Sequence, residues 1–293
     1  MLETIENEQL KISISRIGGE MQSITGNDGT EYLWNGAPAY WKDRALNLFP
    51  YIGRLTNGMY QYAGQLYQLP IHGFLPTSTM IPVQQAPNAV AYTLRYNEQT
   101  LACYPFRFEL QIVYTLTKNV LHVQYIVKNL DDKTMYFGIG GHPGFRVPME
   151  QGKSFSDYRI AFEEKPEKIL FSESCFCTGQ REPLPLNIQN ELELRHELFD
   201  QDAIITWYAG EKVRLYTPGG LHSVTVSAPQ MRYWGFWHWP KTDAPYICIE
   251  PWSSLPSRDG IVEDLSKQED LLSLYPAETY CNTWTITFDS AQK

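Results

Sequence analysis

The sequence predicts an all-β protein built on a large antiparallel β-sandwich with few short helices. Three observations lead to this prediction. Short segments alternate apolar and polar residues, turn-forming residues separate these segments at regular spacing, and helical periodicity is sparse. Aromatic residues make up 14% of the 293 residues, with 19 Tyr and 8 Trp. Rings of this kind are enriched in strands, so the composition agrees with the pattern.

The first half of the chain carries alternating segments joined by hairpin turns. Leu10, Ile12 and Ile14 alternate with polar residues, which is typical of a strand with one buried face. Asp28-Gly29 and Ala63-Gly64 suit tight turns between neighbouring strands. The predicted strands span residues 10–15, 21–24, 31–34, 59–62, 65–69, 90–96, 106–116 and 120–129.

The second half continues this pattern, with predicted strands at 157–162, 204–208, 213–216, 223–226, 231–237, 246–250 and 281–288. The segments 190–198 and 262–265 suit short helices, and residues 40–47 suit a turn or loop. No linker, repeat or change of composition divides the chain. We therefore expect one domain that spans residues 1–293, a length that single β-sandwiches reach.

Composition and charge argue against several classes of partner and location. The formal net charge is −9 and no run of Lys or Arg occurs, so nucleic acid and anionic membranes are poor partners. No apolar stretch approaches the roughly 20 residues of a membrane span, and the first residues lack a secretion-signal pattern. The five cysteines form neither an even set nor a zinc-site pattern, so we expect reduced thiols and a cytoplasmic location.

The segment from Gly140 to Phe145 places a histidine between two glycines and a proline. The glycines allow the backbone to approach a neighbour closely, and Pro143 restricts the residue before it to an extended conformation. A histidine held out in this way, with a pKa near neutrality, suits general acid or base catalysis. We expect His142 to lie where regular structure gives way to a loop. A structural histidine in a turn is the alternative.

Three further polar residues interrupt apolar or glycine-rich segments. Arg54 lies in an apolar stretch before a turn, where it forms a structural ion pair or binds a ligand. His72 lies beside a glycine, as His142 does. Glu250 ends an apolar strand before Pro251, and partial burial would raise its pKa into the range that suits a general base.

Asp200 and Asp202 are two residues apart, so on an extended segment their side chains would share one face. They would then form an acceptor site for hydroxyl groups, or simply the polar start of a strand. A metal site is disfavoured, because no third oxygen ligand follows at calcium-loop spacing.

Several catalytic and cofactor motifs are missing from the sequence. It has no Gly-x-Ser-x-Gly segment, no cysteine in an activating motif, no Gly-x-Gly-x-x-Gly and no phosphate-binding loop. Two histidines, a few carboxylates, an arginine and many aromatic residues remain. This set suits acid–base chemistry on an uncharged, polyhydroxylated ligand. We therefore expect no metal, nucleotide or other cofactor.

Together these segments resemble the aldose 1-epimerase (galactose mutarotase) family, in particular its shorter bacterial branch linked to lactose and galactose use. The resemblance rests on four motifs in the family's order: Arg54-Leu55-Thr56-Asn57-Gly58, His72-Gly73-Phe74, Gly141-His142-Pro143 with Phe145, and Ile249-Glu250-Pro251-Trp252. Membership implies one galactose mutarotase-like sandwich domain that binds a hexose in a groove across one sheet.

The resemblance also implies roles for single residues. His142 corresponds to the family's catalytic acid and Glu250 to its catalytic base, while His72 and Arg54 correspond to residues that bind sugar hydroxyls. The family's sugar-binding aspartate is assigned to Asp202, with Asp200 as second choice. The implied reaction interconverts the α and β anomers of a free hexose such as galactose or glucose, in a monomer or homodimer without a cofactor.

Two other functions remain open. An epimerase of hexose 6-phosphates would need a cationic pocket for the phosphate. Four scattered residues are candidates for it: Arg44, Arg107, Arg146 and Lys241. A carbohydrate-binding protein without catalysis would keep the pocket, but the presence of both His142 and Glu250 favours an enzyme.

One position departs from the family. An aromatic residue commonly follows the His-Pro pair directly, and this chain has Gly144 there. The fit around the sugar ring, and with it the preferred sugar, therefore depends on what replaces that ring.

Overall fold

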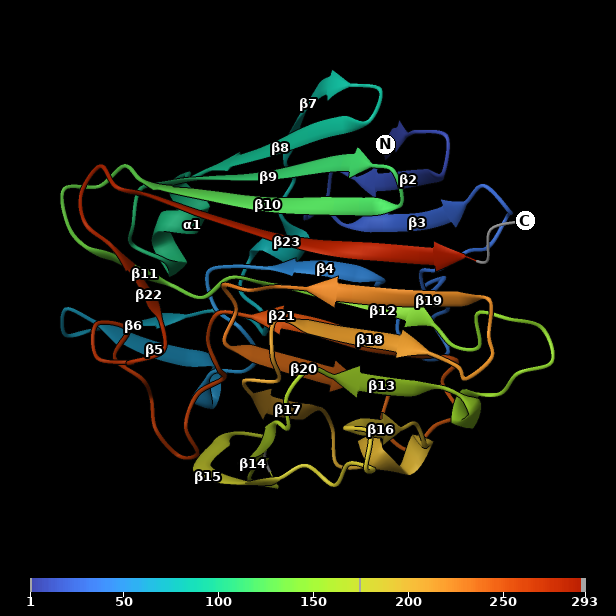
Figure 1. Cartoon of the computed structure of the whole chain (residues 1–293). Coiled ribbons are helices and arrows are strands. Elements are labelled where there is room, and N and C mark those ends of the chain that lie inside the picture. The colour runs from blue at the N-terminus through green and yellow to red at the C-terminus, as the bar shows by residue number, and fades with distance from the viewer. Residues whose placement is uncertain (1, 174, 291–293) are drawn as a thin grey trace.

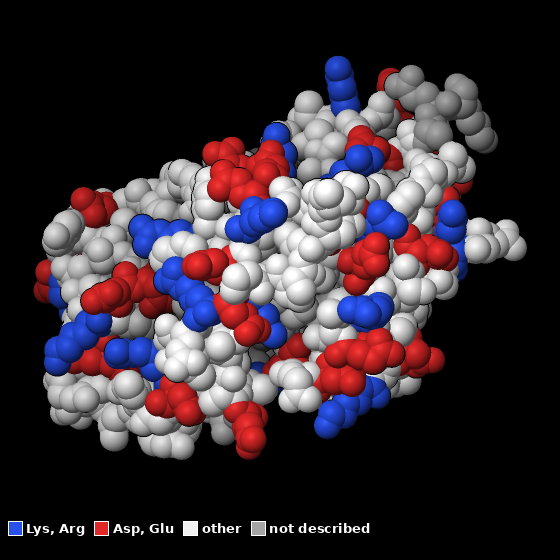
Figure 2. Space-filling view, turned by 60° about the horizontal axis from the view of Figure 1, so that its bottom comes forward, with Lys and Arg blue, Asp and Glu red and all other residues white. Residues whose placement is uncertain are grey.

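The computed structural model describes residues 2–173 and 175–290, and it confirms the all-β prediction. Two large sheets lie face to face, with short strands and loops around them (Figure 1). Neighbouring strands pair antiparallel throughout both large sheets. On the face shown in Figure 2, acidic and basic side chains are interspersed and form no patch of a single sign.

The larger sheet has nine strands in the order β16-β13-β18-β19-β23-β10-β9-β8-β7. Along β10, Leu121, Val123, Tyr125 and Val127 are fully buried, whereas the residues between them are partly exposed, so one face packs on the core. The strands are β7 Ile81–Ala86, β8 Ala89–Arg95, β9 Phe108–Thr117, β10 Val120–Asn129, β13 Arg159–Phe162, β16 Glu191–Glu193, β18 Lys212–Tyr216, β19 His222–Ser227 and β23 Thr279–Ser290.

The second sheet has seven strands in the order β15-β14-β17-β20-β21-β12-β4. Its strands β12 and β21 are buried along almost their whole length, because both faces of the sheet are covered there. The strands are β4 Ala45–Leu48, β12 Gly140–Arg146, β14 Glu167–Phe171, β15 Cys177–Pro183, β17 Ile204–Trp207, β20 Tyr233–Trp237 and β21 Tyr246–Trp252.

Smaller elements surround the two sheets. A three-stranded sheet comprises β1 Leu2–Glu6, β2 Leu10–Ser15 and β3 Met21–Gly26, and two pairs comprise β5 Met59–Tyr62 with β6 Gln65–Gln68 and β11 Met135–Phe137 with β22 Leu272–Leu274. The helices are α1 Glu98–Cys103 and the 3₁₀ turns η1 Thr56–Gly58, η2 Leu75–Thr77, η3 Phe155–Asp157 and η4 His196–Phe199. Among the described residues, no helix has the length and apolar character needed to cross a membrane.

The two large sheets approach closely at the centre of the sandwich. Trp284 of β23 packs against Gly141 of β12, and a Cβ atom at Gly141 would lie 2.6 Å from the tryptophan ring. Nearby, the Tyr125 hydroxyl of β10 donates a hydrogen bond to Asn47 Oδ1 of β4, at 2.8 Å. The position of Gly141 therefore requires a residue without a side chain, since any other would push the sheets apart.

The structure corrects five local predictions. Residues 40–47 were expected to form a turn or loop, but 45–47 belong to β4. Residues 31–34 form isolated bridges instead of a strand, because Glu31 pairs with Thr25 and Leu33 with Phe145 of another sheet. Segment 190–198 starts as β16, which pairs with β13, and only its end is helical. Segment 262–265 is not helical, since its backbone forms hydrogen bonds to Gln61 of β5. In these places tertiary pairing overrides the local pattern.

The fifth correction concerns the segment around His142. Gly140–Arg146 is a strand inside the seven-stranded sheet, between β4 and β21, and is not the loop that the sequence suggested. Glycine and proline argue against a strand on propensity alone. Here the narrow space under Trp284 requires a glycine at position 141, and β4 and β21 provide the hydrogen-bonding partners that make the segment a strand.

Candidate active site

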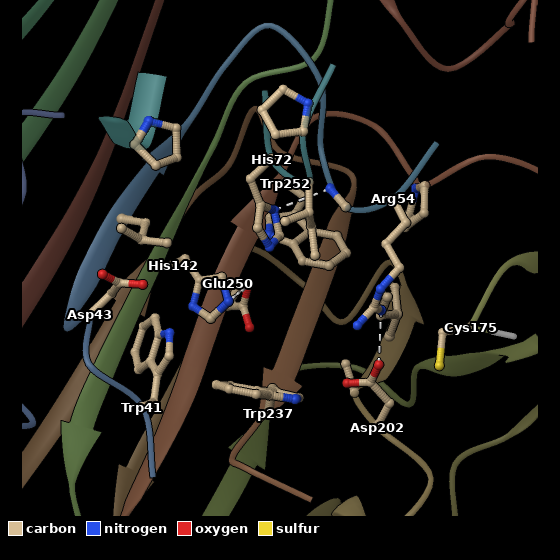
Figure 3. A pocket seen from close by; sticks show the side chains of 18 of the residues that line it. Trp41, Asp43, Arg54, His72, His142, Cys175, Asp202, Trp237, Glu250 and Trp252 are labelled. Atoms are coloured by element: carbon tan, nitrogen blue, oxygen red, sulfur yellow. Dashed lines mark hydrogen bonds and ion pairs between the residues drawn. The ribbon is translucent and has the colours of Figure 1, made fainter. Parts of the chain in front are cut away.

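A cavity of about 390 Å³ opens on the face of the seven-stranded sheet that points away from the nine-stranded sheet. The alternation along β21 creates this arrangement. Ile247 and Ile249 belong to the core between the sheets, whereas Cys248 and Trp252 belong to a second apolar cluster on the other face. Glu250 shares their side and lines the cavity. All five residues predicted for the site line it: Arg54, His72, His142, Asp202 and Glu250 (Figure 3).

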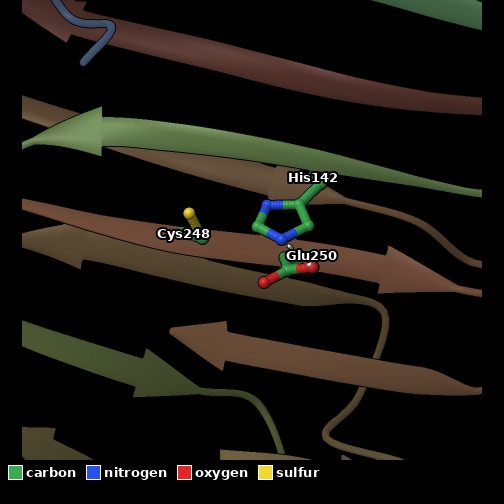
Figure 4. A group of neighbouring side chains, drawn as sticks. All are labelled: His142, Cys248 and Glu250. Carbon is green, nitrogen blue, oxygen red and sulfur yellow. Dashed lines mark ion pairs between the residues drawn. The ribbon is translucent and has the colours of Figure 1, made fainter. Parts of the chain in front are cut away.

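His142 and Glu250 face each other across two antiparallel strands. The β12–β21 ladder pairs Gly140 with Trp252 and Gly144 with Cys248, and this single register places His142 opposite Glu250. The ladder is interrupted between these two pairs, where His142 and Glu250 are each followed by a proline that lacks an N–H group. His142 Nε2 and Glu250 Oε2 are 3.2 Å apart, and both side chains are buried (Figure 4).

Burial controls the protonation of this pair. It raises the pKa of Glu250 well above the ordinary value, and the nearby charge of Asp202 adds to the rise. Burial also holds the pKa of His142 well below its ordinary value, with a further contribution from His72. The low-polarity site thus favours a protonated Glu250 beside a neutral His142. Transfer of one proton from the Glu250 carboxyl group to His142 Nε2, across 3.2 Å, converts this state into a carboxylate and an imidazolium.

Trp41 covers His142 from a distant part of the chain. Its ring lies 4.8 Å from the imidazole of His142, measured between centroids, at an angle of 33°. A Cβ atom at Gly144 would lie 3.1 Å from the Trp41 ring, so the glycine makes room for the indole. The ring that packs on His142 in this chain therefore comes from the loop before β4, in the space that Gly144 leaves open.

Arg54 and Asp202 form an ion pair at the end of the cavity away from Trp41 (Figure 3). Arg54 Nη1 and Asp202 Oδ2 are 3.0 Å apart, and the Arg54 side chain is 47% exposed. Asp200 does not line the cavity, although Asp202 does. The prediction that Asp200 and Asp202 lie on an extended segment is wrong. Asp200 follows η4 in a helical conformation, and Asp202 has φ +86°. The two side chains therefore do not share a face.

His72 contributes a hydrogen-bond donor to the cavity. The N–H of Gly53 donates to His72 Nδ1 at 3.2 Å, so the proton of a neutral ring resides on Nε2. Burial lowers the pKa of His72 to about 4, assisted by the charge of Arg54 and opposed by Asp202. His72 is therefore neutral at pH 7, and its ring meets that of His142 edge-on at 5.4 Å between centroids. It suits an Nε2–H donor to a ligand hydroxyl.

A sulfur atom also lies beside the histidine–glutamate pair. The possible ligand atoms of His142, Cys248 and Glu250 all lie within 4.8 Å of one another, and the three residues are buried (Figure 4). Burial holds the pKa of the Cys248 thiol well above its ordinary value, with a contribution from Glu250. The thiol is thus protonated at neutral pH, and a metal ion would have to displace that proton in order to bind.

Several cavity residues were not found from the sequence. Trp41 and Asp43 come from a loop without periodicity, and Trp237 resembles an ordinary buried strand residue. The run of aromatic residues in 231–237 was the available signal, because sugar sites use flat rings as platforms. Cys175 also lines the cavity beside Asp202, and all five cysteines are unpaired as expected.

A β-sandwich with a buried histidine–carboxylate pair in an aromatic-walled cavity has the features of an acid–base enzyme for a small, neutral ligand. The family model for aldose 1-epimerase matches residues 1–262, and the chain belongs to this family. It is therefore an isomerase of the sugar epimerase and mutarotase type.

Individual relatives agree with this assignment. The chain is 30% identical to the plasmid-encoded protein LacX of Lactococcus lactis subsp. lactis over 301 residues, which covers 97% of this chain and 98% of LacX. A galactose mutarotase related enzyme of Lactobacillus acidophilus has a TM-score of 0.93 at 32% identity, with 100% and 99% of the two chains covered. A galactose mutarotase-like protein of Lactobacillus casei has a TM-score of 0.93 at 30% identity, with 98% and 100% covered.

Proposed function

We propose that this protein is a mutarotase that interconverts the α and β anomers of a free hexose such as galactose or glucose. The observation that carries the proposal is the buried pair of His142 and Glu250, whose Nε2 and Oε2 atoms lie 3.2 Å apart in the cavity. Both groups reach one small region, so they can act on two neighbouring oxygen atoms of a sugar, the anomeric hydroxyl and the ring oxygen.

In the proposed mechanism the pair works as a carboxylate and an imidazolium. Glu250 removes the proton of the anomeric hydroxyl while His142 gives its proton to the ring oxygen, and the C1–O5 bond breaks to leave an aldehyde. The C1–C2 bond then rotates and the ring recloses on the other face of the aldehyde, with the two roles reversed. The resting proton arrangement reaches the working one by a single transfer between the partners.

The charges around the cavity favour a free sugar over a phosphorylated one. Among the described residues that line the cavity, Arg54 is the only arginine or lysine, and it already forms an ion pair with Asp202. Asp43 and Glu250 add further acidic groups. The four cations considered for a phosphate do not line the cavity: Arg44, Arg107, Arg146 and Lys241. A phosphate dianion would therefore lack partners and face like charges.

Several further points belong to the proposal. The five unpaired cysteines support action in the reducing cytoplasm. Aromatic side chains and His72, Arg54 and Asp202 supply stacking surfaces and hydroxyl partners, so the same cavity binds the carbohydrate. The reaction as written transfers protons and breaks and re-forms the C1–O5 bond without oxidation or reduction, so it needs no cofactor.

The test is polarimetry of freshly dissolved α-galactose or α-glucose with the wild-type enzyme and Glu250→Gln. The variant should lose about 10²–10⁴-fold in rate, the usual contribution of a general base, and should still bind sugar in calorimetry. Full activity in Glu250→Gln would overturn the assignment of the base. Sugar binding by the wild-type protein without faster mutarotation would establish a carbohydrate-binding protein in its place.

A further inference from the structure

Asp43 is an acidic residue in the cavity that the mechanism above does not use. It lies on the loop that precedes β4, at the end of the cavity away from Arg54 and Asp202. In Figure 3 its carboxylate lies on the same side of the cavity as Trp41. Among the described residues it forms no ion pair. Burial raises its pKa, while the charge of Lys42 and a hydrogen bond from the Trp41 side chain lower it. A carboxylate accepts several hydrogen bonds, so the contact with Trp41 leaves acceptor capacity for a ligand hydroxyl.

The loop that carries Asp43 is anchored on both sides. Before it, the Trp34 indole N–H donates to the carbonyl of Trp41 at 2.8 Å, and the Tyr40 hydroxyl donates to Asp243 at 2.7 Å. After it, the N–H of Arg44 donates to Glu20 at 2.6 Å. These bonds hold the loop in place, so the carboxylate is a built part of the cavity wall.

The proposed chemistry orients the sugar relative to Asp43. If Glu250 acts at the anomeric hydroxyl and His142 at the ring oxygen, the C2 and C3 hydroxyls extend toward Arg54 and Asp202. The ring oxygen is bonded to C1 and C5, and C5 carries the C6 hydroxymethyl group. The C5–C6 end then lies on the His142 side of the cavity, where Figure 3 shows Asp43.

We propose that Asp43 accepts a hydrogen bond from the C6 hydroxyl of the hexose and is a specificity-determining residue. The inference rests on the proposed mutarotase function and goes further, because it states which substituent the enzyme recognises. The site takes neutral hexoses with a free 6-hydroxyl. It discriminates against 6-deoxy sugars, which offer the carboxylate no donor at C6, and against 6-phosphates, which place a second anion beside it.

The test compares pairs of sugars on the same enzyme preparations, so that the amount of folded protein cancels. Mutarotation rates are measured for galactose and 6-deoxygalactose, and for glucose and glucose 6-phosphate, with wild type, Asp43→Asn and Asp43→Ala. In the wild type, kcat/KM should be about ten- to a hundredfold lower for 6-deoxygalactose than for galactose, as for a lost charged hydrogen bond. In Asp43→Ala the two sugars should differ by less than about threefold.

The phosphorylated sugar gives an independent result. Asp43→Asn keeps the size of the side chain but removes its charge, so the ratio of glucose 6-phosphate to glucose activity should rise above the wild-type ratio. Asp132→Asn, at an exposed position outside the cavity, is the matched control and should leave every ratio unchanged.

The outcomes separate the two proposals. A wild-type enzyme that accelerates mutarotation but treats galactose and 6-deoxygalactose alike overturns the role of Asp43 and leaves the mutarotase proposal intact. An Asp43→Ala variant that slows both sugars equally also overturns it, because a purely structural role predicts that result. A wild-type enzyme inactive on every free hexose overturns both proposals together.

Discussion

His142 and Glu250 occupy directly opposite positions on β12 and β21, with Nε2 and Oε2 3.2 Å apart, although they lie 108 positions apart in the sequence. Opposite residues on antiparallel strands are close neighbours by geometry. The pair is therefore placed by the backbone of a central sheet and not by a loop. Its precision comes from strand register, which a shift of a single residue would destroy.

The first prediction concerns the pH dependence of catalysis. The pKa of Glu250 is raised by burial, so the pair keeps its proton to higher pH than an ordinary carboxyl group would. The pKa of His142 is lowered by burial, so the pair takes up a second proton only well below pH 6.5. The profile of kcat/KM from pH 4 to 9 should be bell-shaped, without an acidic limb at the ordinary histidine value. An acidic limb centred near pH 6.5 would contradict this electrostatic description.

The second prediction concerns Asp202. Its charge raises the pKa of Glu250, so Asp202→Asn should move the alkaline limb of kcat/KM to lower pH, besides weakening sugar binding. Asp200→Asn is a matched control, because Asp200 lies two residues away but does not line the cavity. Equal shifts in both variants would show that the effect is not specific to the cavity.

The third prediction tests the contact between Gly144 and Trp41. In Gly144→Ala the new methyl group would lie 3.1 Å from the Trp41 ring and 3.3 Å from the Arg44 carbonyl, so the indole should move off His142 and activity should fall. The overpacking should cost about 1–3 kcal/mol. Adding Trp41→Leu should remove most of the packing penalty, so urea unfolding of both single variants and the double variant forms a cycle. Additive losses in the cycle would mean that the two residues are not in contact.

The fourth prediction concerns stability in acid. His238 is completely buried, with Nδ1 2.8 Å from the Trp239 carbonyl and Nε2 3.2 Å from His196 Nδ1. Burial lowers its pKa from 6.5 to about 4, so the unfolded chain takes up the proton first as the pH falls. The contribution of His238 to the free energy of unfolding is therefore fully present above pH 6.5. It declines between pH 6.5 and pH 4 by about 1.4 kcal/mol per pH unit, as expected for the uptake of one proton.

Urea unfolding at pH 7 and pH 5 measures this contribution. His238→Gln should lower stability at pH 7 but lose less of it on going to pH 5 than the wild type does. His122→Gln, at a partly exposed position of β10, controls for the general effect of replacing a histidine. An unchanged difference between the two pH values in His238→Gln would rule out His238 as a source of the acid sensitivity.

Much of the fold could be predicted from the sequence, because alternation along strands such as 120–129 is strong and one-sided. The main failure was β12, where Gly141 and Pro143 suggested a loop. The requirement for glycine comes from Trp284, more than a hundred residues away, and no local pattern reports such a contact.

In the candidate site, too, some residues could be predicted from local sequence and others could not. Glu250 and His142 could be found because each is a polar residue next to a proline in an apolar context. Trp41 and Asp43 could not, since their loop has no periodicity and its place over the cavity depends on distant partners such as Asp243. The choice between Asp200 and Asp202 also required the turn conformation at Asp202.

The close packing of Gly141 under Trp284 joins the strand that carries His142 to the opposite sheet. The enzyme therefore has no separate catalytic lobe that could loosen while the sandwich stays intact. Heat inactivation and the loss of tryptophan tertiary signal should occur in a single transition, and a dead but folded intermediate should not accumulate. A substitution that loosens this contact should therefore lower thermal stability and activity together.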